Sequence, residues 1–79
     1  MNISVETELS NLLYNIKYLR VKNEMSKKEM AGIMGIGIAA LDRIEEGQAT
    51  KKLGGRAVLG LSEHFNVLPS VLIEKHLDT

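Results

Sequence analysis

Apolar residues recur along the chain at intervals of three and four, the spacing that places side chains on one face of an α-helix. The longest such stripe predicts a helix over about residues 6–23, and it is formed by Leu9, Leu12, Leu13, Ile16 and Leu19. No segment sustains the alternation of apolar and polar residues that is typical of a β-strand. The fold class is therefore expected to be all-α.

A second, short helix is predicted to begin after Ser26. The Ser26 hydroxyl can accept a hydrogen bond from a free backbone N–H of the first turn while Glu29 reaches back to the N–H of Ser26, an arrangement called a capping box. The residues expected to face inward are Met30, Ile33 and Met34, with Ala31 and Gly32 small enough for another helix to approach. Gly35 and Gly37 are expected to end this helix, since glycine adopts the positive φ of a tight exit without steric cost.

A third helix is expected from Ile38 to Glu46. Leu41 and Ile44, three residues apart, would hold it on the core. Gly47 stands at the position beyond the last turn where glycine commonly closes a helix. The following segment, residues 47–55 (GQATKKLGG), contains two adjacent glycines and no periodicity, which indicates a loop.

A fourth and a fifth helix complete the predicted fold. The fourth is marked by Val58, Leu61, Ser62 and Phe65. Pro69 suits the first turn of a helix, where its missing N–H would have no intrahelical partner, and so opens the fifth. The fifth helix is expected over about residues 69–77 and carries Leu72, Ile73 and Leu77. Five helices around one core are expected.

The composition narrows the class of protein. A chain of 79 residues is one small domain with little room for a deep catalytic cleft. It has no cysteine, which excludes disulfides and thiolate metal sites and suits a reducing compartment. The longest apolar run, residues 31–41, is far shorter than the roughly 20 residues of a membrane span. Because Glu6 and Glu8 stand where a signal peptide would carry basic residues, a cytoplasmic protein that does not enter a membrane is expected.

Catalysis and metal binding have little support in the sequence. His64 and His76 lie on different predicted helices with no acid-rich cluster between them. The serines at positions 26, 62 and 70 are better explained as caps or packing residues, because no histidine and carboxylate are spaced to activate them. We therefore expect no enzyme activity, no metal and no cofactor.

Charge is unevenly distributed although ten basic and ten acidic residues cancel over the whole chain. Residues 17–56 hold nine of the basic residues and five of the acids, a surplus of four positive charges. The flanking segments are acidic. A central basic patch is thus compatible with a neutral total, although an ordinary solvated surface of mixed charge would give the same composition.

Two short helices joined by a glycine-containing turn form the arrangement called a helix-turn-helix. Ala31, Gly35, Leu41 and Ile44 supply a small residue at a helix crossing, a glycine in the turn and two apolar anchors. On these residues, and on the segments IKYLRVKNEMSKKEMAGIMGIG, LDRIEEG and AVLGLSEHFNVLPSVLI, the chain resembles the Cro and phage-repressor family, also called xenobiotic-response-element type. The similarity runs from about residue 12 to residue 73.

This resemblance implies a compact, five-helix, lambda-repressor-like domain over residues 1–79, with its helix-turn-helix at about residues 26–47. It implies a transcriptional regulator that places its third helix in the major groove of double-stranded DNA. The sequence departs from the family pattern at two positions: Lys27 stands where glutamine is usual, and Gly37 where serine or threonine usually caps the third helix. The linker to the fourth helix is also about two residues longer than is common, with Gly54 and Gly55 at a corner that usually contains proline.

The same resemblance assigns base contacts to the outward positions of the third helix, which are Gly37, Ile38, Ala39, Asp42 and Arg43. Of these, only Arg43 can grip the O6 and N7 atoms of guanine. Ile38 and Ala39 can touch thymine methyl groups, and Asp42 can accept from a cytosine amino group. The alternative for Arg43 is a surface ion pair with Asp42, Glu46 or Glu24.

Two further surfaces are predicted. Phosphate contacts are expected from Lys27, Lys28, Lys51, Lys52 and Arg56, each of which taken singly could equally be a solvated surface charge. The segment VLPSVLIEKHL carries more apolar surface than one short helix can bury in its own core, which predicts a homodimer contact through Leu68, Val71, Leu72 and Leu77.

A rival function fits the same fold. The third helix is apolar and partly acidic for a DNA reader, with Ile38, Ala39, Ala40 and Asp42 on its expected outer face. Such a helix would also suit a small antirepressor or modulator that docks on another regulator protein. An unrelated small helical bundle is the remaining alternative.

Overall fold

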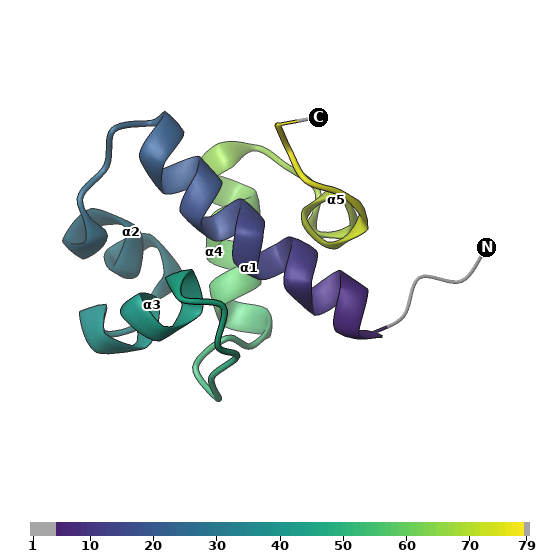
Figure 1. Cartoon of the computed structure of the whole chain (residues 1–79). Helices are drawn as coiled ribbons and strands as arrows, with labels where there is room; N and C mark the ends of the chain where they lie inside the picture. Colours follow the sequence, from purple (N-terminus) through teal and green to yellow (C-terminus); the bar gives the residue numbers. More distant parts are fainter. Residues whose placement is uncertain (1–4, 79) are drawn as a thin grey trace.

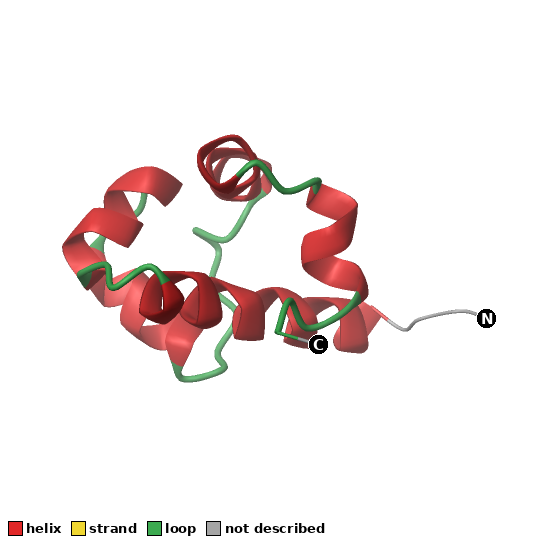
Figure 2. Ribbon diagram, turned by 90° about the horizontal axis from the view of Figure 1, so that it is seen from above, coloured by secondary structure: helices red, strands yellow, loops and turns green. Residues whose placement is uncertain are grey.

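The computed structural model describes residues 5–78, and within this range it contains five α-helices and no strand (Figures 1 and 2). They are α1 (Val5–Lys22), α2 (Lys27–Met34), α3 (Ile38–Glu45), α4 (Gly55–Phe65) and α5 (Pro69–Glu74). The all-α prediction is therefore confirmed. The first three helices begin and end within one or two residues of the expected positions, and α4 contains the four residues that marked the fourth helix.

Helix α1 runs along the molecule and connects its two ends (Figure 1). At one end α3 packs against α1 and α2, and at the other end α5 packs against α1. Helix α4 lies behind α1 in this view and contacts both α2 and α5. The pair α2 and α3 consequently stands at the end of the molecule away from α5.

The predicted capping box at the start of α2 is present. The Ser26 hydroxyl accepts a hydrogen bond from the Glu29 N–H at 3.0 Å, and the Ser26 N–H donates to Glu29 Oε1 at 3.0 Å. This backbone hydrogen bond favours the charged carboxylate and lowers the pKa of Glu29 below its ordinary value. Both observations fix where α2 begins.

The glycines around α3 divide into two kinds. Gly35 ends α2 in the left-handed conformation with φ +69°, and Gly47, just beyond α3, has φ +89°. Gly37 does not share this conformation, which corrects the expectation above. Its φ is −79° because it is the extended N-cap of α3, a position that any residue can adopt.

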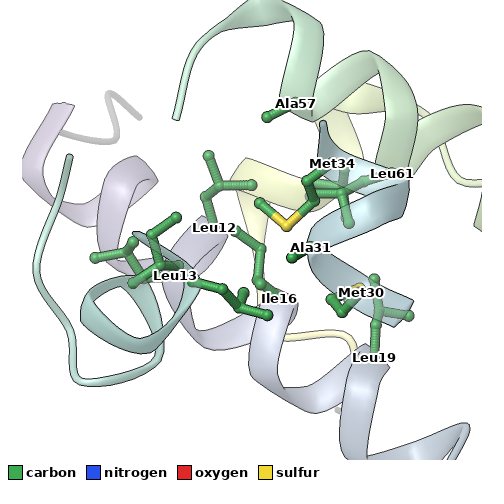
Figure 3. Packing of buried hydrophobic residues seen from close by; sticks show 12 residues of the cluster. Leu12, Leu13, Ile16, Leu19, Met30, Ala31, Met34, Ala57 and Leu61 are labelled. Carbon is green, nitrogen blue, oxygen red and sulfur yellow. The ribbon is translucent and has the colours of Figure 1, made fainter. Parts of the chain in front are cut away.

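The core forms where the five helices meet. Ile16 from α1, Met30 and Met34 from α2, and Leu61 from α4 are almost completely buried, and Figure 3 shows these side chains among their neighbours in the core. Leu41 and Ile44, the predicted anchors of α3, have no exposed surface. The apolar stripe of α1 is buried as expected at Leu12, Leu13, Ile16 and Leu19.

The close approach between helices depends on Gly60 of α4. A Cβ atom at this position would lie 2.3 Å from the backbone oxygen of Ile33 in α2. Gly32, which the sequence nominated for close contact, has nothing within 4 Å of its Cβ position. The glycine that lets α2 and α4 approach is thus Gly60 rather than Gly32, whereas Ala31, the other small residue expected at a helix crossing, is buried in the core.

Helix α5 ends at Glu74, which corrects the prediction of a helix over residues 69–77. The reason lies in α1, where the side chain of Asn15 is completely buried. Its Nδ2 donates to the carbonyl oxygens of Leu72 and Lys75, both at 2.8 Å, and its Oδ1 accepts from the Leu77 N–H at 2.8 Å. These bonds replace the next helical turn, so the chain leaves the helix and runs along α1.

No helix within residues 5–78 is long and apolar enough to cross a membrane.

Candidate nucleic-acid interface

Helix α3 presents an outer face that is free of the core. Because Leu41 and Ile44 point inward, the opposite side is left to solvent. The structure leaves Gly37, Ile38, Ala39 and Arg43 exposed and Asp42 partly exposed. We call these five residues the reading face. Ile38, with 45% of its surface exposed, is its one large apolar residue.

A groove adjoins the reading face on the side of the loop that follows α3. Its lining residues are Gly37, Ala39, Ala40 and Arg43 from α3 and Gln48, Ala49, Thr50, Lys51 and Lys52 from the loop. The structure therefore brings together Arg43, predicted to read bases, and two lysines predicted to contact phosphates. We call this surface the basic groove.

Local bonds hold the loop of the basic groove in shape. The Thr50 hydroxyl accepts from the Lys52 N–H at 3.2 Å, and the Thr50 carbonyl accepts from the Leu53 N–H at 3.1 Å. Leu53 then packs against the core. The two lysines are thus carried on a turn that is anchored on its far side, while their own side chains remain exposed.

An ion pair joins the reading face to the start of α2. Lys27 Nζ lies 2.5 Å from Asp42 Oδ1, with both side chains a little under half exposed. The hydrogen bond to Asp42 raises the pKa of Lys27, which stays charged at neutral pH in any case. Lys27, which was predicted to bind phosphate, and Asp42, which was predicted to contact bases, therefore form an ion pair with each other.

The Arg43 side chain pairs with none of the three acids that the sequence analysis considers. Within residues 5–78 its guanidinium makes no hydrogen bond or ion pair, and Asp42 is paired with Lys27. Its guanidinium remains available on an exposed helix face. The predicted alternative, a surface ion pair of Arg43 with Asp42, Glu46 or Glu24, is not formed.

The remaining predicted phosphate contacts lie around the same end of the molecule. Lys28 is exposed on the first turn of α2. Arg56 is exposed on the first turn of α4, and its Nε lies 4.0 Å from the Cβ position of Gly35, in the turn between α2 and α3. Basic side chains from α2, the loop and α4 thus surround α3.

A bidentate salt bridge fixes α3 against α1, and no pattern in the sequence indicates this pair. Arg20 Nε donates to Glu45 Oε2 at 2.6 Å, and Arg20 Nη2 donates to Glu45 Oε1 at 2.8 Å. Arg20 Nη1 also donates to the Met25 carbonyl at 3.1 Å. The Glu45 side chain is only 5% exposed, so this pair is sheltered from solvent and sets the orientation of α3.

The four residues predicted to form the dimer contact differ in their exposure to solvent. Leu68, the N-cap of α5, is 67% exposed, and Val71 and Leu77 are partly buried. Leu72 is completely buried in the chain's own core, so it cannot contact a second chain in this structure. The predicted surface shrinks accordingly to Leu68, Val71 and Leu77.

A second, largely apolar groove lies between α1 and the end of α3. Its lining includes Leu9, Leu13, Tyr14, Tyr18 and Val21 from α1 and Glu46 and Gly47 beyond α3. We call it the α1 groove. No sequence pattern predicts it, because its apolar residues belong to the stripe of α1 that predicts the core or lie beside that stripe.

Among residues 5–78, no group of three or more acidic or histidine side chains is arranged to hold a metal ion. Comparison of the chain with protein-family models, with curated proteins and with solved structures gave no significant match.

Proposed function

We propose that the chain is a sequence-specific DNA-binding transcriptional regulator of bacterial or phage type, in which α2 and α3 form a helix-turn-helix. In this proposal α3 enters the major groove with its reading face toward the base edges. Phosphates on either side are held by the cations of α2, the loop and the start of α4.

The observation that carries the proposal is the unpaired Arg43 on the exposed face of α3, beside Lys51 and Lys52 in one groove. A guanidinium is the side chain best suited to guanine, since it donates two hydrogen bonds to O6 and N7. Lysines beside it can neutralise the DNA backbone and release its counterions. Ion pairing between Asp42 and Lys27 also offsets the one acid on the reading face.

A binding titration on a randomised duplex library, at two salt concentrations and with recovered sequences read out, tests the proposal. The expected result is enrichment of a defined site with affinity that falls as salt rises. Five neutralised phosphates per subunit correspond to a slope of log K against log salt of about −4.5.

The Arg43→Ala and Lys51→Ala variants separate base reading from phosphate binding. Arg43→Ala is expected to cost about 1–3 kcal/mol on the selected site and to relax base choice at one position. Lys51→Ala, which alters the same groove, should weaken all sequences alike and reduce the salt slope by about 0.9. Equal losses of both variants on all sequences would contradict the role of Arg43.

No retention of DNA even at low salt would reject the proposal and favour the alternative, a small modulator that docks on another regulator protein through the exposed Ile38 and Ala39.

A further inference from the structure

We infer that Asp42 restrains binding to arbitrary DNA sequences by holding Lys27, and that it is therefore a specificity-determining residue. The inference rests on the proposed function and deepens it. Its basis is the 2.5 Å contact between Lys27 Nζ and Asp42 Oδ1, which joins the first residue of α2 to the middle of the reading face.

The first step concerns the state of Lys27 before a DNA phosphate binds. The Lys27 ammonium already has a carboxylate partner in the free protein, unlike Lys28 and Arg56, which make no ion pair within residues 5–78. A DNA phosphate must displace Asp42 or share the cation with it. In either case part of the attraction that a free lysine would give to any sequence is lost.

The second step concerns the carboxylate itself. When Lys27 turns to a phosphate, Asp42 is left with a negative charge on the face that enters the groove. Among the base edges of the major groove, the amino groups of cytosine and adenine are the donors that can compensate it. A site that places one of these amino groups opposite Asp42 therefore recovers the lost partner, whereas a sequence that places an acceptor or a thymine methyl group there does not.

The third step concerns the other acids of α3. Glu45 is engaged with Arg20 and almost completely buried. Glu46, at the C-cap, is exposed and makes no ion pair within the described part of the chain. Of the three acids, Asp42 alone contacts a cation proposed to bind phosphate. Glu46→Gln is consequently a matched control, because it removes the same charge nearby without freeing Lys27.

The experiment compares the wild type with Asp42→Asn, Glu46→Gln, Lys27→Gln and the double variant Asp42→Asn/Lys27→Gln. Dissociation constants are measured over a salt series on an arbitrary duplex and on the duplex selected by the wild type. Thermal unfolding followed by circular dichroism verifies that each variant is folded.

Asp42→Asn is expected to bind the arbitrary duplex about tenfold more tightly than Glu46→Gln at low salt, with a salt slope steeper by about 0.9, the contribution of one phosphate. Its gain on the selected duplex should be smaller, so that discrimination between the two duplexes falls. In the Lys27→Gln background the advantage of Asp42→Asn should disappear.

Equal gains from Asp42→Asn and Glu46→Gln would overturn the inference, since only net charge would matter. A gain that persists without Lys27 would overturn it as well. If the wild type selects no sequence while Asp42→Asn binds duplexes tightly, the restraint stands and sequence-specific regulation fails. If neither binds any duplex, both the inference and the proposed function are wrong.

Discussion

Gly60 shows how one residue without a side chain determines the distance between two helices. Gly32 of α2 and Gly60 of α4 both lie inside a helix, and the sequence predicted a close helix contact only at Gly32. In the structure the backbone oxygen of Ile33 occupies the space beside Gly60, while Gly32 faces open solvent. Of the two small residues expected at a helix crossing, Ala31 is buried and Gly32 is not, because the side of a helix that meets a partner depends on how helices distant in sequence pack.

The same substitution at these two glycines should change stability in opposite directions. Gly60→Ala places a methyl group 2.3 Å from a backbone atom, so α2 and α4 must separate, and it should lower the free energy of unfolding by about 1–3 kcal/mol. Gly32→Ala meets nothing within 4 Å and should raise it by about 0.5–1 kcal/mol through better helix propensity. Urea unfolding of both variants measures the difference. Similar effects of the two substitutions would contradict the close packing at Gly60.

At the scale of elements, a buried polar residue explains why the end of α5 was predicted wrongly. The apolar stripe located α1 to α4 well because periodicity reports burial directly. Helix α5 was predicted too long because Leu77 fits the same spacing, although it lies beyond the helix. The missed signal was Asn15, a polar residue within the stripe of α1, next to Ile16. A buried asparagine needs hydrogen-bond partners, and it finds them at the end of α5.

Further contacts hold the segment beyond α5 on α1. Asn11 Nδ2 donates to the Ile73 carbonyl at 2.9 Å. The ring of Tyr14 stacks on His76 with 3.8 Å between centroids, and its hydroxyl donates to Asp78 at 2.5 Å. The end of the described chain is thus attached to α1 by one row of residues from that helix. Asn15 is the only one of them that replaces several helical hydrogen bonds at once.

Asn15→Ala should therefore destabilise the protein much more than Asn11→Ala. It removes both donors and the acceptor that serve the carbonyls of Leu72 and Lys75 and the N–H of Leu77, and a buried group left without a partner costs about 1–3 kcal/mol. We expect a loss of about 3–5 kcal/mol, against about 1 kcal/mol for the single bond of Asn11. Denaturant unfolding gives both values, and amide hydrogen exchange should show the larger opening in α5. A loss at Asn15 no greater than that at Asn11 would refute this account.

At the scale of the whole molecule, the sequence predicts which side of α3 is exposed, but it does not predict which charged residues form ion pairs. The spacing of Leu41 and Ile44 alone indicates which side of α3 is exposed, so the reading face follows from the sequence. The partners of its charged residues do not. Lys27 with Asp42 and Arg20 with Glu45 join residues on different helices, and these contacts depend on how α1, α2 and α3 are oriented.

Dimerisation is the remaining expectation at this scale. A patch of exposed apolar side chains favours association with another chain. Within residues 5–78, Leu68 is the most exposed large apolar residue outside α1, and Val71 and Leu77 are also partly exposed. A two-fold interface contains such a residue from each copy. Two bound subunits would also double the number of phosphate contacts, which suits a protein whose reading face carries a single strong donor.

The prediction is that the chain forms a dimer in sedimentation equilibrium and that Leu68→Glu raises its dissociation constant at least tenfold. Burying one leucine contributes about 1.5–3 kcal/mol, and the two-fold axis uses it twice. Because Leu68 is 67% exposed, the fold of each subunit should be unaffected. Val21→Glu is the matched control: it places the same charge on another exposed apolar residue, in the α1 groove, and should leave the dimer intact. The reverse result would place the interface in the α1 groove. A wild type that stays monomeric at all concentrations would contradict the prediction of a dimer.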